Sequence, residues 1–457
     1  MKILKIVLFH IVAFSLGSCL FDSNNNTKNE FLDVFDKNRL MIGAMAGSAD
    51  NASFWQKNKG LLDVRYMYLA DAFWCGPTDV PTVYNSAVCN MVHDPINGRS
   101  ENNYMVHPNT DWSPAWHWWG WWQDRTNTNL PPGQYLRSFL NDCSRDGVIP
   151  MITRYTFYQS GQTHCGENRE GRITELGANV EFLTKYFNDF RFMCQIIGEN
   201  KNRKVILHIE PDLLGYGRQL YKCSPNNIAM QVKAANPIDG AGFDNTFAGF
   251  GKCLISMARK YAPNALVGFH ASAWGTASGA SLDNNRNAGM DLKADAAVIA
   301  NDLLELGAGG TDFIALDPLD RDADYYMLTR TTGNGQPDNR WWDAANKTLP
   351  NFAQHFTWVA ELKQIVGLPL VWWQIPLGNA ASPNTAVTDI NSELAGGYKD
   401  NRVDYFMDPE HINEIVKMGG VLLAFGAGQG DQTNPLSDGG NFMNKVKAYK
   451  QSNAGYF

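Results

Sequence analysis

The sequence of 457 residues has no long run of lysine and arginine and no excess of positive charge. It contains 39 lysine and arginine residues against 46 aspartate and glutamate residues, which gives a formal net charge of −7. Proteins that bind nucleic acid normally present a basic patch to the phosphate backbone. We therefore expect no nucleic-acid partner.

Several short motifs of catalytic and metal sites are also missing. There is no CxxC pair and no HExxH motif, so the sequence predicts neither kind of zinc site. There is no GxSxG turn for a serine hydrolase, and the glycine-rich segment 426–430 lacks the lysine of a phosphate-binding loop. We expect no cofactor and no metal ion. A divalent ion held by His208, Glu210, Asp212 and His270 is the alternative.

The sequence lacks an apolar run long enough for a comfortable membrane span, which takes about 20 residues. The apolar run Ile6–Phe14 is shorter, follows Lys2 and Lys5, and precedes the small residues of Leu16–Cys19. A positive start, a short apolar region and small residues before a cleavage site are typical of a signal peptide. The final Leu-Gly-Ser-Cys resembles the bacterial lipobox, in which the cysteine becomes the lipidated first residue.

This pattern predicts a lipoprotein signal peptide over residues 1–18, with Cys19 as the lipid anchor. The polar residues that follow predict a flexible tether over 19–30. The expected location is extracytoplasmic, at the outer membrane or the cell surface of a bacterium. An ordinary signal peptide with an incidental cysteine is the alternative.

Cysteine is sparse, and seven cysteines remain besides Cys19. In an oxidising compartment some of them could pair, and the loop-like positions favour Cys75–Cys89 and Cys165–Cys223. Three others lie within helical patterns and are expected to be buried thiols, namely Cys143, Cys194 and Cys253.

Eight short apolar runs recur along the chain, each of the kind expected for a parallel strand buried on both faces. They are Arg39–Met45, Arg65–Ala70, Val148–Arg154, Lys204–Glu210, Ala265–His270, Asp312–Asp317, Pro369–Gln374 and Gly420–Phe425. Between them lie apolar residues at helical spacing, in segments that include 182–197, 247–261, 291–306, 351–366, 409–418 and 441–450. This alternation predicts a TIM-type (β/α)8 or distorted barrel over residues 31–457, as a single large domain. An open, doubly wound sheet is the alternative.

Polar side chains cluster where these predicted strands end. The fourth strand runs into His208-Ile209-Glu210-Pro211-Asp212, and the sixth ends at Asp317. Because side chains alternate along a strand, we expect His208 and Glu210 to point the same way. In a barrel the ends of all eight strands meet at one rim, which is where active sites of this fold lie.

Tryptophan is abundant, with 14 residues, and six of them fall between Trp112 and Trp122. That segment lies in a long loop after the second predicted strand, and a loop rarely has enough core to bury six indole rings. Aromatic rings beside carboxylates are typical of sites that bind sugars. The sequence therefore favours a carbohydrate ligand.

Two segments resemble family six glycoside hydrolases, the cellobiohydrolases and endoglucanases with a distorted barrel. Val205–Leu214 is similar to that family's Ile-Glu-Pro-Asp-Ser-Leu segment. Ala262–Ala265 and Gly268–Gly275 are similar to its Pro-Asn-Ala and Gly-His-Ala-Gly-Trp stretches, in the same order. The two matches cover well under a tenth of the chain, and they imply a barrel that cleaves a β-glucan-like polysaccharide.

The resemblance lacks one essential residue. The family's catalytic acid is an aspartate after an earlier strand, and the corresponding segment here, 153–158, contains no carboxylate. The retaining glycosidases of clan A place glutamates on strands four and seven. Here Glu210 fits the first position, and Gln374 stands at the second.

From these patterns we predict a glycoside hydrolase in which Glu210 is the general acid/base and Asp317 the opposing carboxylate, with Asp212 as a further catalytic candidate. The residues expected to bind substrate around them are Asp71, Trp74, Trp118, Trp121, Tyr155, His208, His270, Trp274, Asp322, Trp373, Gln374 and Asp431. A non-catalytic carbohydrate-binding lipoprotein with the same barrel is the alternative.

Overall fold

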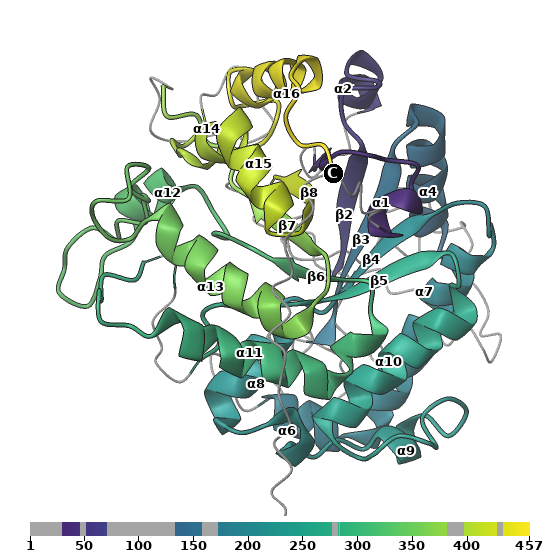
Figure 1. Ribbon diagram of the computed structural model, residues 1–457. Helices are drawn as coiled ribbons and strands as arrows, with labels where there is room; N and C mark the ends of the chain where they lie inside the picture. Colours follow the sequence, from purple (N-terminus) through teal and green to yellow (C-terminus); the bar gives the residue numbers. More distant parts are fainter. Residues whose placement is uncertain are drawn as a thin grey trace, which may run out of the picture.

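The computed structural model describes residues 30–45, 52–70, 133–157, 172–276, 282, 284–381, 397–426 and 433–457. Its centre is a closed barrel of eight parallel strands in sequential order (Figure 1). The strands are β1 (Met41–Ala44), β2 (Val64–Ala70), β3 (Ile149–Tyr155), β4 (Val205–Ile209), β5 (Ala265–His270), β6 (Phe313–Leu316), β7 (Leu370–Ile375) and β8 (Gly420–Phe425).

The eight predicted strands and the TIM-type barrel are thereby confirmed. β1 pairs with β8 in parallel, from Met41 opposite Leu422 to Ala44 opposite Phe425. This pairing closes the sheet and excludes the open, doubly wound alternative. The strands differ from the predicted segments by two residues or fewer at each end.

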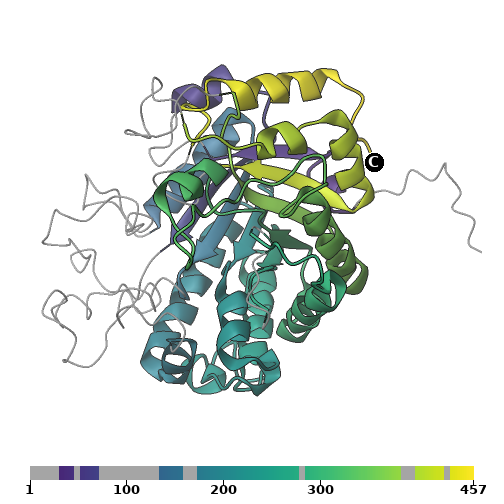
Figure 2. The same cartoon turned by 90° about the vertical axis from the view of Figure 1, so that its left-hand side faces the viewer.

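Helices follow the strands and cover the outside of the barrel (Figures 1 and 2). The longer ones are α4 (Gln134–Asp146), α7 (Val180–Gly198), α8 (Leu213–Tyr221), α10 (Phe247–Tyr261), α11 (Leu292–Leu306), α13 (Phe352–Val366), α15 (Pro409–Lys417) and α16 (Asn441–Gln451). The shorter ones are α1 (Glu30–Asp33), α2 (Ala52–Lys57), α6 (Arg172–Ala178), α9 (Val232–Ala235), α12 (Ala323–Thr329) and α14 (Arg402–Phe406), with two 3-10 turns, η4 (Pro225–Asn227) and η5 (Ala308–Gly310).

Local capping explains where several of these helices begin. Asn179 accepts a hydrogen bond from the backbone N–H of Phe182 at the start of α7, and Thr246 accepts one from Gly249 at the start of α10. The same contact begins α11 at Asp291 and α13 at Asn351. Each such cap satisfies a backbone donor that the helix cannot pair itself and contributes about 1 kcal/mol.

The alternation of side chains along the strands separates two apolar layers. On β2, Tyr66 and Tyr68 belong to a cluster inside the barrel, whereas Met67 and Leu69 belong to the layer between the strands and the helices. β7 follows the same rule, since Trp373 lies inside and Trp372 outside. The barrel is therefore a packed core rather than a pore, as in other eight-stranded barrels.

The amino ends of the strands are closed by the start and the end of the described chain. Phe31 of α1 contacts the Phe313 ring edge-on at a centroid distance of 5.6 Å, beneath β6. Phe457 donates its backbone N–H to the carbonyl of Asn38, so the C-terminus lies beside α1 (Figure 1). The opposite rim, where the strands end, carries polar side chains, among them Asp212 and Asp317.

The cysteines of the described residues are free thiols. Cys143, Cys194 and Cys253 are buried on helices, as predicted. Cys223 is also free and half-buried, so the structure does not contain the predicted Cys165–Cys223 disulfide. Cys165, Cys75 and Cys89 lie outside the described residues.

Two ion pairs allow a test of how burial controls their contribution to stability. Arg65 on β2 binds Asp146 at 3.0 Å, and each side chain is only 2% exposed. Replacing Asp146 by Ala removes the carboxylate from a buried guanidinium, so we expect the free energy of unfolding to fall by about 3–5 kcal/mol.

The control is Glu181→Ala, which breaks a pair with Lys185 on the surface of α7, where Glu181 is 64% exposed. Its expected effect is about 0.3–0.5 kcal/mol. Urea denaturation of both variants measures the difference. Equal losses of unfolding free energy in the two variants would contradict the burial of the Arg65–Asp146 pair.

Candidate active site

Two carboxylates lie at the rim where the strands end. Asp212 follows β4 and Asp317 follows β6, with β5 between them. Both are half-buried, and the side chain of Asp317 is 16% exposed. Tyr155, the last residue of β3, donates its hydroxyl to Asp212 at 2.8 Å. His270, the last residue of β5, places its Nε2 atom 3.0 Å from an Asp317 oxygen. Four consecutive strands of the barrel thus supply one polar cluster.

The turn after β4 has an unusual backbone. Glu210 has a φ of 46° and Asp212 a φ of 69°, both in the left-handed region that residues other than glycine rarely adopt. A third such residue, Gln374 near the end of β7, has a φ of 58°. Conformations of this kind cost about 1–3 kcal/mol each and persist only where the surroundings enforce them. Three of the six such residues in the described part of the chain thus lie at two strand ends on one rim.

Glu210 does not share a face with His208, and that prediction is wrong. Strand alternation would direct Glu210 into the barrel, but its left-handed backbone turns the carboxylate outward, toward α7. There the carboxylate accepts hydrogen bonds from the backbone N–H groups of Thr156 and Phe157, at 3.0–3.2 Å, and from the Tyr186 hydroxyl at 2.7 Å.

The surroundings of Glu210 are closed to a substrate. The residue is 5% exposed, and the adjoining apolar cavity of about 20 Å³ has room for about one water molecule. Burial raises the pKa of Glu210, while the Arg154 guanidinium and the hydrogen bonds from Tyr186, Phe157 and Thr156 act in the opposite direction. The side chain of Glu210 therefore lies in the wall of the barrel, although its backbone belongs to the turn at the rim.

Asp212 has the electrostatic environment of a proton donor. Burial raises its pKa from 3.8 to about 6, and the nearby carboxylates of Asp317 and Asp320 add to the increase. His270 and the hydrogen bond from Tyr155 act in the opposite direction. A carboxyl group with a pKa near 6 keeps its proton in mildly acidic solution, which is the state that a general acid requires.

Two histidines and a tryptophan form the floor beneath these carboxylates. The rings of His208 and His270 lie 5.2 Å apart, and the edge of Trp373 meets them at 4.8 and 5.5 Å. All three are almost fully buried, and Nε2 of His208, Nδ1 of His270 and Nε1 of Trp373 have no hydrogen-bond partner among the described residues. Burial, followed by the proximity of His270, lowers the pKa of His208 well below its usual value. His208 is therefore neutral, and it contacts Thr153 through Nδ1.

Gln374 lies beside this cluster, at the position expected from the sequence. Its side-chain oxygen accepts a hydrogen bond from the Tyr68 hydroxyl at 3.0 Å, and its amide donates to the carbonyl of Asp320. Gln374 thereby links β2, β6 and β7 across the rim. Its amide has no acid–base function, so a clan A mechanism with a nucleophile on strand seven does not fit this site.

Asp322 does not lie at the substrate face, which corrects the prediction for that residue. It is completely buried, and its carboxylate accepts hydrogen bonds from the backbone N–H groups of Gly378 and Thr433. Burial and the neighbouring Asp400 raise its pKa to about 8. Asp322 holds together the segments that follow β6, β7 and β8, so its role is to shape the rim.

Trp274 follows β5 and is half-buried. Its ring packs on Tyr216 of α8 at a centroid distance of 4.6 Å. A side chain at Gly215 would come within 2.8 Å of this ring, so glycine there lets α8 approach the indole closely. Trp274 is thus fixed in place on the β5 side of the rim.

Other predicted residues cannot be placed. Asp71, Trp74, Trp118, Trp121, Asp431 and Cys19 lie outside the described residues. Sequence reasoning in turn missed Tyr68, Tyr186 and Asp320 as partners of site residues. Tyr68 carried a usable signal, since it occupies an inward position near the end of an apolar strand. The contact of Tyr186 with Glu210 carried none, because it depends on the left-handed backbone of the turn.

Among the described residues, no group of three or more histidine, cysteine, aspartate or glutamate side chains is arranged to hold a metal ion. Within the same part of the chain, no helix is both long and apolar enough to cross a membrane.

No family model and no curated protein sequence matches the chain. Among solved structures, an endo-1,4-β-D-mannanase of Thermotoga petrophila is 13% identical, with 90% of this chain and 100% of that chain covered and a TM-score of 0.46. The GH53 catalytic domain of Ignisphaera aggregans is 10% identical, with coverages of 90% and 96% and a TM-score of 0.43. A fungal β-1,4-galactanase is 8% identical, with coverages of 89% and 99% and a TM-score of 0.43.

The neighbours named here are glycoside hydrolases. Identities of 8% to 13% and TM-scores of 0.43 to 0.46 do not transfer an activity to this chain. The barrel assignment depends on the hydrogen-bonded strand order, and the chemistry depends on the residues at the rim.

The titration of Asp212 tests this arrangement without a substrate. We expect two aspartate carboxyl groups that titrate near pH 6, those of Asp212 and Asp438, visible by NMR of protein labelled with ¹³C at the aspartate carboxyl carbons. The resonance that disappears in Asp212→Asn is that of Asp212. Replacing Asp317 by Asn removes a like charge and should lower the pKa of Asp212, whereas Tyr155→Phe removes a hydrogen bond to the charged form and should raise it. A pKa of Asp212 that neither substitution moves would show that these groups do not meet at the rim.

Proposed function

We propose that this protein is a glycoside hydrolase in which Asp212 is the general acid and Asp317 the opposing carboxylate. The observation that carries the proposal is the pair itself: two half-buried carboxylates on one rim, with the pKa of Asp212 raised to about 6 by burial and by Asp317. Hydrolysis of a glycosidic bond needs one carboxyl group that is protonated and one that is ionised. Asp212 replaces Glu210 in the role that the sequence predicted.

The reaction assigns a distinct task to each carboxyl group. Asp212 donates its proton to the glycosidic oxygen as the bond to the anomeric carbon breaks. Asp317 acts on the other face of the sugar, either by removing a proton from the attacking water or by forming a glycosyl ester that water then cleaves. A separation of about 6.5–9.5 Å between the carboxyl groups suits the first course and about 5–5.5 Å the second. His270, in contact with Asp317, fixes the orientation of that carboxylate.

A β-glucan-like polysaccharide is the proposed substrate. Support comes from the sequence resemblance of Val205–Leu214 to family six glycoside hydrolases and from the tryptophan-rich segment 112–122. The three aspartates near the rim, Asp212, Asp317 and Asp320, favour a sugar without negative charge, because an anionic sugar would be repelled. The protein would act at the bacterial cell surface, held there by a lipid on Cys19.

Substitution of the two carboxylates tests the proposed activity. Wild type should release reducing sugar from at least one member of a panel of β-glucans, mannans, xylans and galactans. Asp212→Asn and Asp317→Asn should each lower kcat by about 100-fold or more, since general acid–base catalysis contributes about 10²- to 10⁴-fold.

Binding of the two variants to the insoluble polysaccharide should persist. If wild type binds but releases nothing, the protein is a carbohydrate-binding lipoprotein without catalysis. If neither variant loses activity, the assignment of the carboxylates is wrong.

The pH dependence of hydrolysis follows from the direction of the shift at Asp212. A general acid is active while protonated, so the rate should fall as the pH rises above about 6. Tyr155→Phe raises the pKa of Asp212 and should move this alkaline limb to higher pH. Measured kcat/KM profiles of both proteins test the sign, and a shift to lower pH would contradict the role of Asp212.

The proposed membrane anchor makes a separate prediction. In a bacterial host that processes lipoproteins, wild type should fractionate with membranes and incorporate labelled palmitate. Cys19→Ala lacks the acceptor thiol and should do neither. Equal labelling of both proteins would rule out Cys19 as the lipid attachment site.

A further inference from the structure

We propose that Glu210 is a positioning residue that holds Tyr155 and Asp212 at hydrogen-bonding distance from each other. Glu210 lies two residues before Asp212, and its carboxylate binds the two residues that directly follow Tyr155. The proposal rests on the proposed function only in treating Asp212 as the catalytic acid. The geometry that it concerns exists without a substrate.

On the β3 side, Glu210 fixes the backbone that carries Tyr155. Both carboxylate oxygens lie within 3.0–3.2 Å of the backbone nitrogens of Thr156 and Phe157. The strand hydrogen bonds end here, because the backbone N–H of Glu210 makes the last contact between β3 and β4, to the carbonyl of Arg154 at 2.7 Å. Beyond that point the backbone N–H groups that follow β3 bind the Glu210 side chain instead of the backbone of β4. The residues before and after Tyr155 are therefore both hydrogen-bonded to Glu210.

On the β4 side, Glu210 stabilises the turn that presents Asp212. The turn contains two left-handed residues, Glu210 before Pro211 and Asp212 after it. The ring of Pro211 restricts the backbone between them. Left-handed conformations are unfavourable for residues other than glycine, so other contacts must enforce them at Glu210 and Asp212. Hydrogen bonds between a buried carboxylate and backbone N–H groups are strong enough to do this. Without them the turn would relax, and Asp212 would move away from Tyr155.

The carboxylate of Glu210 and the backbone groups that it binds, which we call the Glu210 clamp, are anchored to the outer helices. The Tyr186 hydroxyl on α7 donates to Glu210 at 2.7 Å, and its ring packs against Phe157 and Phe250. Asp189, one turn further along α7, pairs with the buried Arg154 of β3. α7 thus contacts both the Glu210 carboxylate, which accepts the hydrogen bonds, and the chain at the end of β3, whose backbone donates them. A carboxylate so enclosed cannot reach a substrate, so its effect on Asp212 is transmitted through the backbone.

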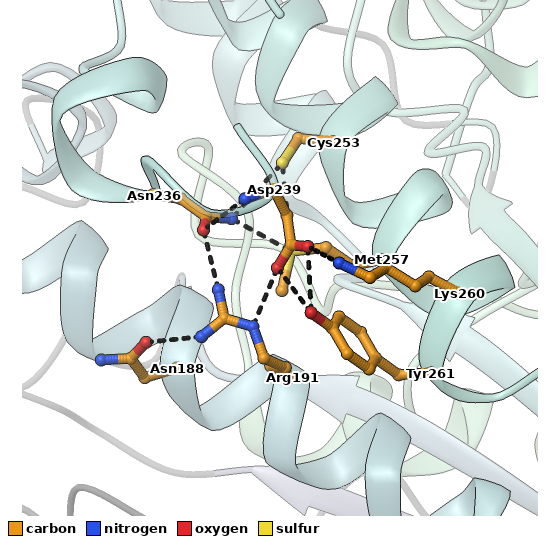
Figure 3. A network of polar contacts seen from close by, with 8 residues as sticks. All are labelled: Asn188, Arg191, Asn236, Asp239, Cys253, Met257, Lys260 and Tyr261. Atoms are coloured by element: carbon orange, nitrogen blue, oxygen red, sulfur yellow. Dashed lines mark hydrogen bonds and ion pairs between the residues drawn. The ribbon is translucent and has the colours of Figure 1, made fainter. Parts of the chain in front are cut away.

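Asp239 offers a matched control on the same side of the molecule. It is a buried carboxylate that also contacts α7, through Arg191 at 2.8 Å, and it accepts hydrogen bonds from Lys260 and Tyr261 of α10 (Figure 3). Its side chain is 4% exposed. Asp239 precedes α10, and its partners on α7 and α10 lie on the outside of the barrel, away from the rim. Loss of its charge should reduce stability without affecting Asp212.

The test compares Glu210→Gln with Asp239→Asn by crystallography and by the titration of Asp212, both without substrate. A glutamine presents an N–H₂ group to the two backbone donors, so one of these contacts becomes repulsive. We expect the Tyr155 hydroxyl and Asp212 to lose their hydrogen bond in Glu210→Gln, by separating beyond about 3.5 Å, and the pKa of Asp212 to rise. In Asp239→Asn the distance should stay near the 2.8 Å of wild type, with the pKa of Asp212 unchanged.

The kinetics of hydrolysis, measured on a polysaccharide that the wild type cleaves, supply a second readout. A displacement of about 1 Å can lower a rate about 100-fold, so Glu210→Gln should lower kcat by about 10- to 100-fold with KM little changed. The alkaline limb of its kcat/KM pH profile should shift to higher pH, as in Tyr155→Phe. Asp239→Asn, assayed below its unfolding temperature, should retain the kcat and the pH profile of wild type.

The outcomes separate this proposal from the proposed function. An unchanged Tyr155–Asp212 distance and titration in Glu210→Gln would overturn the positioning role, whether or not the protein hydrolyses glycans. A lengthened distance in a protein that cleaves no glycan would support the clamp and refute the hydrolase. If Glu210→Gln does not fold, Tyr186→Phe removes one hydrogen bond from the clamp. It should raise the pKa of Asp212 by a smaller amount, and no rise there would also overturn the proposal.

Discussion

Closure of the parallel sheet by the pairing of β1 with β8 is the constraint on which the rest of this structure depends. In a closed barrel every strand end lies on one rim, so residues far apart in sequence become neighbours. Tyr68 and Gln374 are 306 positions apart, yet they share a hydrogen bond across this rim. Closure also leaves a packed interior. The buried histidines His208 and His270 lie at the top of this interior, directly beneath the carboxylates. The polar cluster is thus a consequence of the topology, and its chemistry depends on which residues occupy the strand ends.

The rim brings several carboxylates together where they are partly shielded from water, and this raises the pKa of Asp212. Burial and the charges of Asp317 and Asp320 act together, so the protonated form of Asp212 is favoured up to about pH 6. Tyr155 and His270 oppose that shift, which keeps the pKa within reach of the solution pH. The left-handed turn that presents Asp212 costs conformational energy, and the buried Glu210 clamp offsets it. Stability and proposed function are therefore coupled at this turn.

Much of the fold was predictable because each strand is a near-continuous apolar run that ends in a polar residue. Ala265–His270 and Gly420–Phe425 match β5 and β8 residue for residue. The meeting of Asp212, Asp317, His208 and His270 at one end also followed from strand order. The side on which Glu210 lies did not, since a left-handed glutamate breaks the alternation on which the prediction relied. Nor did the burial of Asp322, because Gly378 and Thr433, which enclose it, lie 56 and 111 positions further along the chain.

The most direct test of the central claim is a crystal structure of the Asp212→Asn variant with a bound oligosaccharide of the polysaccharide that the wild type hydrolyses. The account predicts a glycosidic oxygen within hydrogen-bonding distance of the substituted side chain at position 212, with the Asp317 carboxylate on the opposite face of the same sugar. Glu210 should remain out of contact with the ligand, bound to Thr156, Phe157 and Tyr186. An oligosaccharide bound away from the rim, or one that contacts Glu210 and not the side chain at position 212, would contradict the account.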